Sequence, residues 1–151
     1  MTPSQARNSI KKCLKSLIDP KPKTNEKNEI WRYFNNNCAY CGCELFQKSR
    51  KGHIDHLYSE MEGGSNRLSN LVLACDICNG DEKRESDWKE FLAGKYGVDN
   101  SEYQKKIKRI EDWIEINGGN TFLSESEKIS LQIEFDVINE VLTKSIEKFR
   151  Q

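Results

Sequence analysis

Two Cys-x-x-Cys pairs constrain this chain more than any other feature of its sequence. Cys38 and Cys41 form the first pair, and Cys75 and Cys78 form the second. A two-residue gap lets a tight turn direct both sulfurs at one metal ion about 2.3 Å away, and two pairs complete a tetrahedral site with no position left for substrate. The pattern therefore predicts a structural zinc ion, the alternatives being buried cysteines without metal or a redox dithiol. We interpret the nearby Cys43 as a strand residue and not as a ligand.

The interval between the pairs contains both histidines of the chain, His53 and His56, with Asp55 between them. Phosphodiester hydrolysis needs a base that deprotonates water and a cation that stabilises charge on the phosphate and the leaving oxygen. Hard cations such as Mg²⁺ prefer oxygen ligands. Asp55 and His56 supply a ligand and a base, provided that the strand ends or bends there, because neighbouring strand residues point to opposite faces. The amide oxygen of Asn79, just after the second pair, is placed to close the same metal site.

Several short motifs follow one another in order along residues 38–83. They are Cys-x-x-Cys-Gly, Ile-Asp-His, Gly-Gly-x-Asn and Ser-Asn-Leu-Val-Leu-x-Cys-x-x-Cys-Asn. In this order they resemble the HNH endonucleases, the zinc-bound branch of the His-Me finger or ββα-metal nucleases. The resemblance implies that His56 is the general base and that Asp55 and Asn79 bind a catalytic Mg²⁺ or Mn²⁺ ion. It also implies that the side chain of Asn70 braces the loop and hairpin around the histidine.

The same stretch carries side chains that we expect to contact nucleic acid. Members of the family often place a lysine three residues after the last asparagine, whereas this chain has Glu82 there and Lys83 one residue later. Lys83 is the expected phosphate contact of this segment. Arg50 and Lys51, in a basic turn, and His53, on the hairpin, are the other expected contacts. The alternative for each is an ordinary solvated side chain.

The length of 151 residues suits one domain with helical extensions. We expect an α+β, mostly helical fold. N-terminal helices and a linker occupy residues 1–36, a ββα-metal nuclease core occupies 37–90, and a C-terminal helical extension occupies 91–151, all in one compact unit.

Local patterns predict the individual elements. Apolar spacing predicts helices over 4–18 and 26–34. Two short strands are expected at 43–46 and 52–57, joined by the basic turn. Later helices are expected to start at capping boxes, which pair Asp87 with Glu90, Ser101 with Gln104 and Ser124 with Glu127.

The last predicted helix, over about 124–150, has an unusually wide apolar surface. One row consists of Ile129, Ile133, Val137 and Val141, and a second consists of Leu131, Phe135, Ile138, Leu142 and Phe149. Packing on one neighbouring helix does not need both rows. The helix is either the spine of the C-terminal layer or a surface for a protein partner or a homodimer.

We therefore expect a metal-dependent endonuclease that hydrolyses DNA to 5′-phosphate and 3′-hydroxyl ends, serving as the nuclease subunit of a restriction or anti-phage defence system. The alternative is a non-catalytic zinc module that binds nucleic acid or protein. Basic and acidic residues are equal at 24 each, so overall charge does not separate these readings. No apolar run approaches the ~20 residues of a membrane span, so we expect no membrane association and a cytoplasmic protein.

Overall fold

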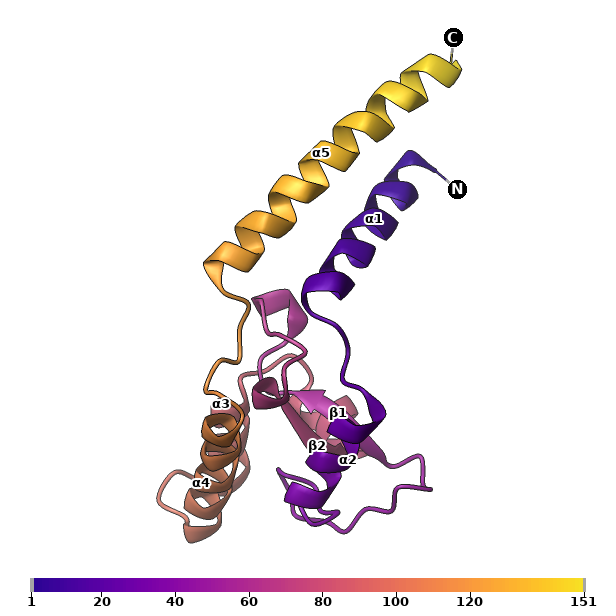
Figure 1. Ribbon diagram of the computed structural model, residues 1–151. Coiled ribbons are helices and arrows are strands. Elements are labelled where there is room, and N and C mark those ends of the chain that lie inside the picture. Colours follow the sequence, from indigo (N-terminus) through magenta and orange to yellow (C-terminus); the bar gives the residue numbers. More distant parts are fainter. Residues whose placement is uncertain (1, 151) are drawn as a thin grey trace. The chain divides into compact units, whose positions relative to one another are not determined.

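The computed structural model describes residues 2–150 and divides into two compact units (Figure 1). One unit joins the two ends of the chain, up to Lys21 and from Leu123 onward, and we call it the two-helix unit. The other is Pro22–Phe122, which we call the sheet unit. The segment boundaries expected at residues 36 and 90 stay predictions.

The sheet unit is built on an antiparallel pair of strands. β1 (Gly52–His56) pairs with β2 (Leu71–Cys75), with Gly52 opposite Cys75 and His56 opposite Leu71. All five residues of β2 are buried, so this strand is covered on both faces. The apolar run Leu-Val-Leu-Ala-Cys thus forms the centre of the core.

The strand expected at 43–46 does not form, and its pairing with 52–57 was wrong. Glu44 makes only an isolated bridge to Asn37, and Phe46 is 64% exposed. β1 pairs instead with the apolar run of β2, because that pairing buries more apolar surface than a strand with exposed Glu44 and Phe46 would.

Helices surround the strand pair and make the fold mostly helical, which confirms the predicted α+β class. β2 leads directly into a π-helix, η3 (Ile77–Lys83), which completes a ββα arrangement. The remaining elements of this unit are α2 (Thr24–Tyr33), α3 (Trp88–Tyr96), α4 (Ser101–Ile116) and the 3₁₀ turns η1 (Glu60–Glu62) and η2 (Leu68–Asn70). The buried Trp113 of α4 joins the outer helices to the sheet, because its Nε1 donates to the carbonyl oxygens of Leu68 and Leu71, each at 2.8 Å.

Side-chain caps fix where the later helices begin. The Asp87 carboxylate accepts from the Glu90 amide at 3.1 Å and starts α3 as expected. α4 is capped by Asn100, one residue before the expected Ser101. Before α5 (Glu125–Arg150), Ser124 and Glu127 form the predicted reciprocal capping box.

The two-helix unit consists of α1 (Pro3–Ile18) and α5, which run side by side in opposite directions (Figure 1). Arg7 donates to Asn139 Oδ1 at 2.7 Å and to Thr143 Oγ1 at 3.2 Å. One turn further along α1, the Lys11 ammonium lies 5.7 Å from the Phe135 ring centroid. In the part of the chain that the structure describes, neither these nor any other helix is long and apolar enough to span a membrane.

Candidate functional site

The two Cys-x-x-Cys turns converge as the sequence spacing predicts. The sulfur atoms of Cys38, Cys41, Cys43 and Cys75 all lie within 4.8 Å of one another. Cys41 Sγ and Cys75 Sγ are 3.7 Å apart. A tetrahedral zinc ion with bonds of about 2.3 Å requires about 3.8 Å between sulfurs, which the distance between Cys41 and Cys75 matches.

A fifth cysteine completes this group. The side chain of Cys78 is buried and hydrogen-bonds to Cys38, which lowers the pKa of the Cys38 thiol to about 4. Cys43, by contrast, is exposed. The structure thus offers two thiols for the fourth ligand position: the predicted Cys78, and Cys43, whose position near the cluster the spacing rule did not identify.

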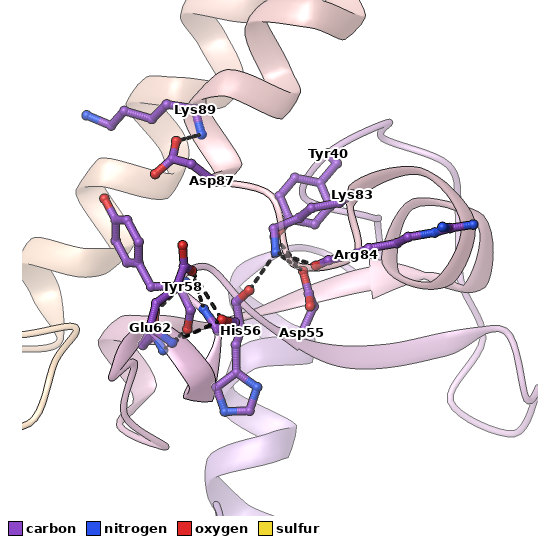
Figure 2. A network of polar contacts seen from close by, with 11 residues as sticks. Tyr40, Asp55, His56, Tyr58, Glu62, Lys83, Arg84, Asp87 and Lys89 are labelled. Atoms are coloured by element: carbon purple, nitrogen blue, oxygen red, sulfur yellow. Dashed lines mark hydrogen bonds and ion pairs between the residues drawn. The ribbon is translucent and has the colours of Figure 1, made fainter.

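Asp55 lies near the end of β1 and is almost fully buried, at 7% exposure. Its Oδ2 accepts a hydrogen bond from the Tyr40 hydroxyl at 2.6 Å and lies 3.3 Å from the Lys83 ammonium (Figure 2). Burial raises the pKa of Asp55 above its usual value, while Lys83 and Tyr40 act in the opposite direction. Oδ1 has no hydrogen-bond partner among the described residues, so it is the oxygen left for a metal ion.

Lys83 was expected to contact phosphate, but its side chain is only 1% exposed and lies inside the unit. Besides Asp55, the ammonium donates to the backbone oxygen of His56 at 2.8 Å and to that of Arg84 at 3.4 Å. Lys83 is the last residue of the π-helix η3, and a π-turn contains one more residue than an α-turn. The extra residue before Lys83 and the inward direction of its side chain therefore occur in the same segment. The expected phosphate contact would require this buried side chain to turn outward.

His56 is the last residue of β1, where the strand ends as its cooperation with Asp55 requires. Its imidazole points away from the Tyr40–Asp55–Lys83 contacts (Figure 2). The Nε2 atom lies 3.0 Å from Asn66 Oδ1. Since a carbonyl oxygen only accepts, this contact places the proton of a neutral imidazole on Nε2 and leaves the Nδ1 lone pair free.

Asn70 is fully buried and joins two segments around the histidine. Its Oδ1 accepts from the Tyr58 amide, and its Nδ2 donates to the carbonyl oxygens of Tyr58 and Ser65, each at 2.9 Å. Gly64 packs so closely here that a Cβ atom would lie 1.9 Å from the Tyr58 oxygen. These contacts are those of a structural brace, while a role of Asn70 in catalysis stays a prediction.

The other predicted site residues lie at the surface. Asn79, on η3, is partly exposed, and the structure records no hydrogen bond to its side chain. Arg50, Lys51 and His53 are all exposed, on the turn before β1 and on β1 itself. They are accessible to a nucleic acid, but nothing bound identifies them as contacts.

Sequence reasoning assigned no role to two residues that touch the site. Asn66 belongs to the Gly-Gly-x-Asn motif, so the motif contained the signal even though it did not show that this side chain reaches His56. Tyr40 lies between the first two cysteines, and its contact with Asp55 spans 15 positions, which no local pattern reveals.

Comparison with known proteins agrees with this geometry. Residues 38–85 match the family model for the HNH endonucleases. A curated relative from Bacillus subtilis (strain 168), "SPbeta prophage-derived putative HNH endonuclease YoqL", is 28% identical over 128 residues, covering 73% of this chain and 51% of the relative. The chain thus spans about half the length of that relative. No solved structure matches the chain. Residues 38–85 therefore carry an HNH endonuclease domain, and its cysteine cluster fits the zinc-bound branch of that family.

Proposed function

We propose that this protein is a metal-dependent endonuclease that hydrolyses phosphodiester bonds in DNA and leaves 5′-phosphate and 3′-hydroxyl ends. The observation that carries the proposal is the arrangement at the end of β1. There a buried carboxylate, Asp55, and an imidazole with one free nitrogen, His56, occupy adjacent positions.

His56 acts as the general base through Nδ1. The hydrogen bond to Asn66 fixes the ring orientation and the tautomer, which prepares Nδ1 to accept a proton from water. When the proton moves to Nδ1 the ring becomes positive, and the Asn66 oxygen stabilises that charge through the Nε2–H bond.

Asp55 and Asn79 would hold the catalytic Mg²⁺ or Mn²⁺ ion, which when bound neutralises charge on the phosphate and on the departing oxygen. Carboxylate and amide oxygens are the donors that such ions prefer. Tyr40 and Lys83 both contact Oδ2 of Asp55, so they fix the carboxylate plane and leave Oδ1 as its metal-binding atom. The donor set therefore fits the ion that the family implies.

The reaction is a displacement at phosphorus. The water oxygen forms a bond to phosphorus as His56 takes its proton, and the bond from phosphorus to the 3′ oxygen breaks. The 3′ oxygen then takes a proton from solvent. The zinc cluster takes no part in these steps, because four thiolates leave it no open position.

The proposal also includes the nucleic-acid partner, the cellular compartment and the larger system in which the protein acts. DNA is the partner, and the exposed side chains of Arg50 and Lys51, just before β1, and of His53, on β1, would contact the DNA backbone. A reducing compartment such as the cytoplasm fits a site made of thiolates. We propose a place as the nuclease subunit of a restriction or anti-phage defence system. The relative's name gives only a prophage origin.

Cleavage of supercoiled plasmid by the zinc-loaded protein tests this proposal. Nicked or linear product that appears only with added Mg²⁺ or Mn²⁺, and whose ends carry 5′-phosphate and 3′-hydroxyl groups, is the expected result. Omitting the added ion is a better control than a strong chelator, because a chelator would also strip zinc from the cysteines. Binding of DNA without cleavage under any of these conditions would favour the non-catalytic zinc module.

A further inference from the structure

The two helices of the two-helix unit bury no apolar side chain among the residues that the structure describes. In α1 no residue is buried, and in α5 no side chain from 125 to 149 is buried. Isolated helices are marginal in water, and helices in proteins are stabilised mainly by packing an amphipathic face. A pair of helices without buried side chains therefore needs a further layer.

α5 shows where that layer belongs. Leu131, Phe135 and Leu142 are partly covered, and Phe135 lies beside Lys11 of α1. The row of Ile129, Ile133, Val137 and Val141 is left in solvent, with exposures of 58%, 56%, 56% and 62% in that order. On α1, Leu17 is 79% exposed. Within the other row Phe149 is also exposed, at 84%. One α1 helix thus covers part of one apolar row of α5 and leaves the other row in solvent.

Charge indicates what covers the exposed row. α1 is purely basic, with Arg7, Lys11, Lys12 and Lys15 and no acidic residue. α5 is mainly acidic up to residue 149, with Glu125, Glu127, Glu134, Asp136, Glu140 and Glu147 against Lys128, Lys144 and Lys148. An apolar row on an acidic helix is complementary to a basic amphipathic helix, and α1 of another copy is such a helix.

We propose that two copies of this chain associate through their two-helix units, with α1 of each copy covering the exposed row of α5 in the other. This arrangement is isologous, since the same two helices meet on both sides of a two-fold axis and the contact closes at two copies. It forms a four-helix layer in which each α5 has a basic helix on both of its apolar rows. The dimer would bring two sheet units into one particle. The inference rests only on α1 and α5 and stands whether or not the sheet unit cuts DNA.

Sedimentation equilibrium of the full, zinc-loaded chain across micromolar concentrations tests the proposal. We expect a dimer whose dissociation constant rises with salt, because opposite charges meet across the contact. Val137→Glu places a carboxylate in the apolar contact and should raise the dissociation constant by about 100-fold or more. The matched control is Val98→Glu in the sheet unit, since Val98 is 52% exposed and Val137 is 56% exposed. The control should stay dimeric.

A second pair of variants tests the pairing of α1 with α5. Lys12→Glu reverses an exposed charge on α1 and should weaken the dimer, whereas Lys27→Glu, an exposed position on α2, should not. Circular dichroism shows whether each variant keeps its helices. A monomeric wild type would overturn the proposal, as would a dimer that Val137→Glu and Val98→Glu affect equally. A helical Lys12→Glu variant with wild-type affinity would refute the charge pairing.

Discussion

Replacing Lys83 with methionine removes the counter-charge of a buried carboxylate while it keeps most of the side-chain volume. The Lys83 ammonium lies 3.3 Å from Asp55 Oδ2, and the two side chains are 1% and 9% exposed. At an effective dielectric constant of about 20, this separation corresponds to about 5 kcal/mol of attraction. Part of that is offset because the variant no longer buries an ammonium group. We therefore expect a loss of about 3 kcal/mol, the lower end of the range for breaking a buried ion pair.

Urea unfolding followed by tryptophan fluorescence measures this loss in the right part of the molecule. The three tryptophans, Trp31, Trp88 and Trp113, are all buried in the sheet unit. The signal therefore reports on the unit that contains the ion pair. The protein is zinc-loaded and free of Mg²⁺, so that no catalytic ion replaces the lost charge.

The variant's pH dependence has a definite sign. Burial raises the pKa of Asp55, and Lys83 lowers it, so the pKa rises further in Lys83→Met. A carboxyl with a raised folded-state pKa contributes most stability below its unfolded pKa of 3.8 and loses that contribution as pH rises through the folded value. The deficit of Lys83→Met should thus be largest at high pH and shrink on acidification, within the range where zinc content is unchanged.

Two controls make the result specific. Lys89→Met removes an ion pair with Glu111 whose side chains are 46% and 47% exposed, and it should cost less than about 1 kcal/mol. Asp55→Asn removes the carboxylate charge, so adding Lys83→Met in that background should cost much less than it does alone. A Lys83→Met variant as stable as Lys89→Met, or one whose cost is unchanged in Asp55→Asn, would refute the reasoning.

Three further predictions concern the same unit. Asn70→Ala removes a fully buried side chain with three hydrogen bonds and should lower the free energy of unfolding by about 3 kcal/mol in urea titrations; a change below 1 kcal/mol would contradict its role as a brace. Cys43→Ser should retain zinc, whereas Cys78→Ser should lose it, because the buried Cys78 belongs to a Cys-x-x-Cys turn and Cys43 is exposed; metal analysis giving the reverse order would exchange their roles. Tyr40→Phe removes the 2.6 Å hydrogen bond to Asp55 and should raise the carboxyl pKa, which carbon NMR of the Mg²⁺-free protein measures; an unchanged value would show that this bond does not hold the carboxylate.

Local spacing predicted the parts of the structure that depend on few residues. Each Cys-x-x-Cys turn needs only a two-residue gap, and α1 and α2 follow the apolar period of their own segments. β1 ends at His56, where the chemistry of the adjacent Asp55 required an end or a bend.

Contacts between distant segments were not predictable in the same way. The predicted partner of β1 was wrong, because strand pairing depends on which run buries the most apolar surface. Leu71–Cys75 buries more than the nearer residues 43–46, so β1 pairs with it. The burial of Lys83 depends on Asp55 from another element and on the π-turn between Cys78 and Lys83. The sequence around Lys83 is acidic and signals neither the contact with Asp55 nor the π-turn.

The most direct test of the account compares the rate of DNA cleavage by wild type and by His56→Ala under single-turnover conditions with Mg²⁺ or Mn²⁺. Loss of a positioned general base predicts a rate lower by about 10²–10⁴-fold. Zinc content and tryptophan fluorescence should match the wild type, because the imidazole points away from the Asp55–Lys83 contacts and is no ligand of the cysteine cluster. A folded, zinc-loaded His56→Ala protein that cleaves at the wild-type rate would contradict the assignment of His56 as the base.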